Sequence, residues 1–61
     1  MDKQKFIQKA TACRVIADGL LADAYDLADK AARGESIWWA ERILDEVDAL
    51  LNYLQAEENE Q

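Results

Sequence analysis

The chain lacks proline and histidine altogether, and it has only two glycines and one cysteine in 61 residues. Without histidine, neither a Cys/His zinc site nor a nucleophile activated by histidine can be assembled from one copy of the chain. The single cysteine, Cys13, cannot close an intramolecular disulfide. We therefore expect no catalytic residues, no cofactor and no metal site, and a protein that is not an enzyme.

The chain is also short for a stable domain. A domain of about 60 residues buries only roughly 60% of the surface that its unfolded chain exposes. Such a chain usually needs a disulfide, a metal or a partner to be stable. Hydrophobic residues make up 51% of the sequence, which argues against disorder. We therefore expect one domain, residues 1–61, that another copy or another protein stabilises.

Long apolar runs are missing as well. No stretch approaches the roughly 20 apolar residues of a membrane-spanning helix. The start of the chain, Met1 to Lys9, is polar and does not resemble a secretory signal. A lone free cysteine is typical of a reducing compartment. These features predict a cytoplasmic protein without a membrane segment.

Acidic residues outnumber basic ones by 13 to 7, which gives a net charge of −6. The excess lies in residues 34–61, where Arg42 is the only basic residue. Basic side chains gather instead near the start of the chain, at Lys3, Lys5, Lys9 and Arg14. An acidic balance disfavours nonspecific binding to nucleic acid, because phosphate contacts supply most of that affinity.

A composition rich in alanine, leucine, aspartate and glutamate predicts an all-α fold. The strongest break in the pattern is Gly34, because glycine adopts the left-handed conformation that ends many helices. Ser36 can then cap the next helix. We expect one helix over about residues 3–33, a turn at 34–35, a second helix over about 36–57 and a frayed tail at 58–61. The short turn makes the two helices antiparallel neighbours.

Apolar residues recur every three to four positions along both expected helices, which is the spacing of a heptad seam. The seam consists of Phe6, Ala10, Cys13, Ala17, Leu20, Ala24, Leu27 and Ala31 in the first helix and Ile37, Ala40, Leu44, Val47, Leu51 and Leu54 in the second. With its flanking residues, each seam is wider than one neighbouring helix can cover. A homodimeric four-helix bundle buries it most simply. The alternative is a different helical protein, which would make the chain a subunit or chaperone of a hetero-helical complex.

Two adjacent tryptophans are the most informative residues outside the seam. Neighbouring helical residues point about 100° apart, so Trp38 and Trp39 cannot both enter it. Arg42 lies within helical reach of both rings, and Tyr53 shares a stripe with Trp39, with Glu46 between them. These residue types anchor many protein interfaces, so we expect all five to form a partner-binding surface. The alternative is that one tryptophan covers the end of the bundle near the turn.

The basic cluster supports a second hypothesis. With its hairpin layout, alanine seam and opening of the form Met1-x-Lys3-Gln4, the chain resembles the Rop family of plasmid copy-number regulators. Rop-type proteins are dimeric helical hairpins that bind paired RNA loops through one helical face. The resemblance implies an RNA-binding regulator whose candidate contacts are Lys3, Lys5, Lys9 and Arg14.

The first hypothesis is the one that the sequence favours. It describes a small, acidic, homodimeric helical hairpin that catalyses nothing and binds a protein partner. The short length and the missing catalytic patterns suit the accessory inhibitors, adaptors and regulators of phages and plasmids.

Overall fold

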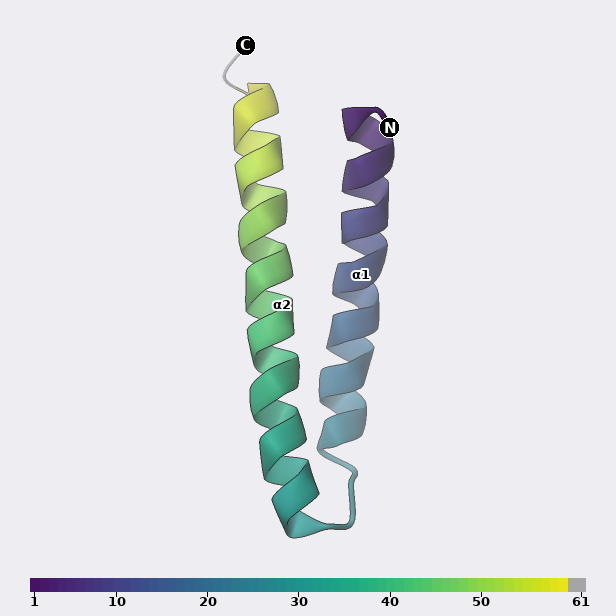
Figure 1. Cartoon of the computed structure of the whole chain (residues 1–61), viewed down its shortest axis with the longest axis vertical. Coiled ribbons are helices and arrows are strands. Elements are labelled where there is room, and N and C mark those ends of the chain that lie inside the picture. Colours follow the sequence, from purple (N-terminus) through teal and green to yellow (C-terminus); the bar gives the residue numbers. More distant parts are fainter. Residues whose placement is uncertain (60–61) are drawn as a thin grey trace.

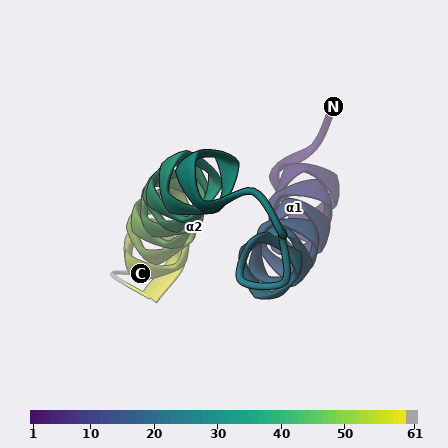
Figure 2. The same cartoon turned by 90° about the horizontal axis from the view of Figure 1, so that it is seen from below.

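A computed structural model describes the backbone of residues 1–59 and the side chains of residues 1–56. The chain forms two α-helices, α1 over Lys3–Ala24 and α2 over Lys30–Asn59. They run antiparallel and side by side, and a short connection joins them at one end (Figure 1). Seen from below, this connection crosses from α1 to α2 (Figure 2). The rod measures 48 × 17 × 14 Å, and the predicted all-α helical hairpin is confirmed.

The connection lies earlier in the chain than predicted. α1 ends at Ala24 rather than near residue 33, and Gly34 and Ser36 lie inside α2. Gly34 does not have a positive φ, so it does not end a helix. The predicted helix over 3–33 and the predicted turn at 34–35 are therefore wrong.

The end of α2 also lies beyond the predicted residue 57. The helix continues to Asn59, so the predicted frayed tail begins inside it. The remainder of that tail, residues 60–61, lies outside the described residues.

Asp29 explains why α2 begins early. Its carboxylate accepts a hydrogen bond from the amide of Ala31 at 3.1 Å, and its carbonyl accepts one from the amide of Arg33 at 2.8 Å. An aspartate at this place satisfies amides that have no partner within the helix. The Arg33 guanidinium donates to the carbonyl of Leu27 at 2.9 Å, which fastens the connection to the first turn of α2.

Removal of this cap should destabilise the start of α2. We expect Asp29→Ala to lower the free energy of unfolding by about 1 kcal/mol. Asp26→Ala is the matched control, because the Asp26 side chain is exposed and makes no hydrogen bond within residues 1–56. It should change stability by less than about 0.5 kcal/mol. Urea unfolding followed by circular dichroism measures both variants, and equal losses would contradict the assigned cap.

The two helices meet through small residues on α1 and larger ones on α2. Ala10, Ala17 and Ala24 are buried, and Ala17 is only 2% exposed. Alanines at this spacing let two backbones approach closely. The facing side of α2 consists of Ile37, Ala40, Leu44, Val47, Leu51 and Leu54, all buried or half-buried.

The best-packed part of the interface lies far from the connection. Ile7, Ala10 and Leu51 form a buried cluster, and Val47 and Leu54 pack against it. This part of the chain therefore holds the open end of the hairpin together.

The structure divides the predicted seam of the first helix. The alanines at 10, 17 and 24 face α2. Ala31 lies in the first turn of α2 and is exposed. The larger residues of the predicted seam are exposed as well, namely Phe6, Cys13, Leu20 and Leu27. Ile7 packs on Leu51 of α2 instead, and Leu21 is half-buried. One neighbouring helix covers only part of a wide apolar stripe, so the remainder stays exposed.

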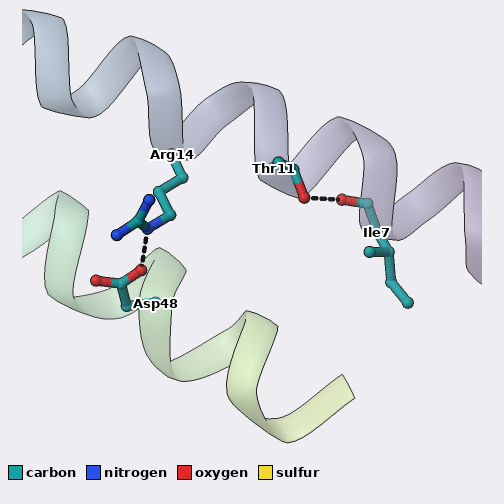
Figure 3. A network of polar contacts seen from close by, with 4 residues as sticks. All are labelled: Ile7, Thr11, Arg14 and Asp48. Carbon is teal, nitrogen blue, oxygen red and sulfur yellow. Dashed lines mark hydrogen bonds and ion pairs between the residues drawn. The ribbon is translucent and has the colours of Figure 1, made fainter. Parts of the chain in front are cut away.

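One long side of the hairpin is polar. Nε of Arg14 in α1 donates to Oδ1 of Asp48 in α2, and the two side chains form an ion pair (Figure 3). On the same side, the Thr11 hydroxyl donates to the carbonyl of Ile7 at 2.8 Å. The Arg14 and Asp48 side chains are 51% and 42% exposed, so their pair contributes only about 0–1 kcal/mol. The pair shows which residues of the two helices lie at the same level.

The two glycines lie inside helices without a packing reason. Apart from its adjacent residues and the nearby backbone of its own helix, a Cβ added at Gly19 or Gly34 would meet no atom within 4 Å. Because glycine inside a helix costs about 0.5–1 kcal/mol relative to alanine, we expect Gly19→Ala and Gly34→Ala each to stabilise the protein by that amount. The two gains should add, since the sites are distant. Thermal unfolding of the single and double variants measures this, and a loss at either site would reveal a contact that the isolated hairpin does not make.

Candidate interaction surfaces

An apolar depression of about 360 Å³ lies between the helices near the connection. Leu20 and Leu27 line it from one side, and Trp39 and Ile43 line it from α2. Leu20 lies about 120° around α1 from Arg14, so this depression and the Arg14 ion pair lie on different sides of the hairpin.

The same side of the hairpin carries a longer apolar stripe. Helical residues seven apart share a side, so Cys13 and Phe6 continue the line of Leu20, and Leu50 continues the line of Ile43. Phe6 is 43% exposed, Leu20 51% and Ile43 45%. We call this surface the apolar face; it consists of Phe6, Cys13, Leu20, Leu27, Ile43 and Leu50. An exposed patch of this kind marks a site of interaction.

A second surface gathers aromatic rings on α2. The rings of Trp38 and Trp39 meet edge to face, with centroids 4.7 Å apart and planes at 89°. This geometry is one that aromatic pairs prefer. The two side chains are nevertheless 53% and 50% exposed, so they present a large apolar area to solvent.

Polar neighbours hold both rings in place. Nε1 of Trp39 donates to the carboxylate of Glu35 at 3.0 Å, one turn earlier. The guanidinium of Arg42 lies over the Trp38 ring, 5.6 Å from its centroid. A cation–π contact at an exposed site contributes about 0.5–1 kcal/mol. We call Trp38, Trp39 and Arg42 the aromatic cluster.

Glu46 borders this cluster, whereas Tyr53 stands apart from it. Trp38, Arg42 and Glu46 line a shallow depression of about 380 Å³ together with Glu41 and Asp45. Tyr53 is 65% exposed and lies four turns beyond Trp39, about 21 Å along the helix. The structure therefore gathers four of the five predicted partner-binding residues and leaves Tyr53 separate.

The basic residues near the start of the chain do not form one surface. Arg14 is engaged with Asp48 on the polar side. Lys9 is exposed and lies about 140° around α1 from Arg14. Exposed Lys5 lies one turn from Lys9, whereas half-buried Lys3 lies about 160° around the helix from Lys5, so the predicted RNA contacts occupy two sides of α1.

Sequence reasoning missed the apolar face as a surface, because it assigned the whole seam to the interior. The repeat of Phe6, Cys13, Leu20 and Leu27 at intervals of seven was its signal. The bond between Glu35 and Trp39 was missed for another reason. Glu35 was placed in the turn, where the one-turn spacing to Trp39 has no meaning.

Within the described residues, no group of three or more histidine, cysteine, aspartate or glutamate side chains is arranged to hold a metal ion. Neither helix, over the same residues, combines the length and apolar character needed to cross a membrane. Comparisons with protein-family models, curated proteins and solved structures find no match to this chain.

Proposed function

We propose that the chain is a small, non-catalytic interaction protein. It buries its apolar face against the helices of another polypeptide, and it binds a protein partner through the aromatic cluster. The observation that carries this proposal is the edge-to-face pair of tryptophans, each about half exposed on a helix surface.

The aromatic cluster has the composition of a binding site, and its side chains are already oriented. Tryptophan and arginine are enriched among residues that dominate binding energy at interfaces. Here Glu35 holds Trp39 and Arg42 lies over Trp38, so both rings are already oriented. A surface that is ordered before binding loses less conformational entropy when the complex forms.

The charges beside the cluster indicate the chemistry of the partner. The depression next to Trp38 is bordered by Glu41, Asp45 and Glu46, with Arg42 as its only cation. Such a border attracts a partner that presents basic side chains, and this attraction weakens as salt rises. We therefore propose a basic protein surface as the partner.

Partner capture by variants tests this function. We expect Trp38→Ala to lose a partner that the wild-type chain retains, with affinity reduced about thirtyfold or more, the effect of an interface residue worth at least about 2 kcal/mol. Arg42→Ala should weaken binding in the same direction. The immobilised chain is incubated with a lysate of the source cells, and the retained proteins are identified. The affinity of each purified partner for the wild-type chain and the variants is then measured.

Tyr25→Ala is the matched control, because Tyr25 is an aromatic side chain with 59% exposure that lies in the connection, outside the cluster. It should retain the partner fully. Circular dichroism of each variant must show unchanged helicity. Equal binding by Trp38→Ala and the wild type would reject the aromatic cluster as the binding site.

A further inference from the structure

We propose that a second copy of the chain covers the apolar face, with the two hairpins packed antiparallel and their connections at opposite ends. This inference rests on one part of the proposed function, the burial of the apolar face against another polypeptide. It adds the identity of that polypeptide, its orientation and its register.

The apolar face is symmetric about one level of the hairpin. In α1, Cys13 and Leu20 lie equally far from a midpoint between Ile16 and Ala17, and Phe6 near the start of α1 and Leu27 in the connection lie beyond them on either side. A two-fold axis at this level would place Phe6 of one copy beside Leu27 of the other.

The residues of α2 share this symmetry at the same level. Ile43 and Leu50 lie equally far from a midpoint between Glu46 and Val47. The contacts between the helices bracket both midpoints, with the Arg14–Asp48 ion pair on one side and the depression that Leu20 and Ile43 line on the other. One axis perpendicular to the helices therefore satisfies both, and it packs Ile43 against Leu50 of the second copy.

The same axis fills the apolar depression. Phe6 is exposed at the open end of the hairpin, whereas the depression lies near the connection, between Leu27 and Trp39. Antiparallel packing brings Phe6 of each copy to the depression of the other. Both depressions are then occupied by the same side chain, as a closed two-fold interface requires.

Charge favours this orientation over the parallel one. Lys9 and Asp23 lie on the Ile16 side of α1, seven residues before and after Ile16, and both are exposed. In the antiparallel dimer, each Lys9 lies beside Asp23 of the second copy. If the connections lay at the same end, α1 would face α2 of the second copy. Lys9 would then lie at the level of Tyr53, where residues 1–56 provide no carboxylate on this side of α2.

Two aromatic residues outside the apolar face also lie symmetrically about the proposed two-fold axis. Trp39 and Tyr53 lie seven residues before and after Glu46 on one side of α2, so each Trp39 ring meets Tyr53 of the second copy. Trp38 and Arg42 stay outside the contact. The dimer therefore uses Trp39 in its own contact and leaves Trp38 and Arg42 free for a partner.

Sedimentation equilibrium and cross-linking test the arrangement. The wild-type chain should sediment as a dimer over a wide range of concentrations. Ile16→Cys, made in the Cys13→Ala background, should be joined to its own copy by a short bismaleimide, because Ile16 lies at the axis. The matched control is Val15→Cys in the same background, because Val15 is 65% exposed and points about 140° around α1 from Leu20, away from the apolar face. It should not be joined.

Charge reversal tests the orientation without a cross-linker. Lys9→Glu should weaken dimerisation about tenfold, because it replaces two attractive contacts between the copies by two repulsive ones. The double variant Lys9→Glu/Asp23→Lys should restore the affinity of the wild-type chain. The effect should shrink at high salt, where exposed charges are screened.

The outcomes separate this inference from the proposed function. A chain that is monomeric at all concentrations overturns the second copy as the occupant of the apolar face. A dimer in which Ile16→Cys does not cross-link and the double charge variant does not recover overturns the antiparallel arrangement. Neither result affects partner capture through Trp38 and Arg42, which is measured separately.

Discussion

Leu51→Ala is expected to remove most of the stability of this chain. Leu51 is 7% exposed and is the largest buried side chain among residues 30–56 of α2, where it packs on Ile7 and Ala10. Truncation of a buried leucine costs about 2–5 kcal/mol, since the lost transfer energy and the remaining cavity add. A chain of this length has a free energy of unfolding of about 3–9 kcal/mol. Urea unfolding followed by circular dichroism should therefore show a partly unfolded variant even without denaturant.

Val15→Ala provides the control for this prediction. Val15 is 65% exposed on α1 and does not belong to the buried cluster, although its truncation to alanine also removes methyl groups. Its effect should remain within about 0.5 kcal/mol. If both substitutions reduced stability equally, the cluster around Leu51 would not be the main source of cohesion between the helices.

The helices and the core side of α2 were predictable because they depend on local periodicity. Every seam residue predicted from Ile37 to Leu54 is buried or half-buried in the hairpin. The position of the connection was not predictable in the same way, because two segments of the sequence carry signals for a break between helices. Glycine, here Gly34, is the commoner signal for the end of a helix. In the structure, however, Asp29 caps α2 and Arg33 binds the carbonyl of Leu27. The second of these contacts forms only in the folded connection.

The contact side of α1 depends on packing between the two helices, which the apolar pattern of α1 alone does not reveal. The alanines at 10, 17 and 24 are flanked by apolar residues on both sides, Phe6 and Leu20 on one and Ile7 and Leu21 on the other. A helix lined with alanine can therefore be rotated either way. In the structure, the pairing of Arg14 with Asp48 accompanies the rotation toward Ile7, which leaves Phe6 and Leu20 exposed.

In the aromatic cluster, by contrast, a contact could be predicted from the sequence pattern. Arg42 follows Trp38 by four residues, the spacing at which helical side chains meet. This one contact could be predicted as soon as the segment was assigned to a helix. The depression beside it is lined by residues of α2 alone, and Glu41 and Asp45 follow Trp38 at helical spacing, so their shared side also follows from the helix assignment.

Leu20→Asp is the second substitution for which we expect a large effect, and it acts on association rather than on the fold. Leu20 is 51% exposed in the hairpin, so a carboxylate there remains hydrated and the two helices can still pack. In the proposed dimer, both copies of the carboxylate would enter the apolar contact beside Cys13. Burial of an unpaired charge is strongly unfavourable, so we expect the dissociation constant to rise at least about a hundredfold.

Sedimentation equilibrium of Leu20→Asp should accordingly show a monomer at concentrations where the wild-type chain is a dimer. Its melting temperature should also stop depending on protein concentration, because association no longer contributes to stability. Val15→Asp is the matched control, since it introduces the same charge at an exposed aliphatic position that points away from the apolar face. If Val15→Asp dissociated the dimer as strongly as Leu20→Asp, net charge rather than the apolar face would govern association, and the assigned dimer contact would be wrong.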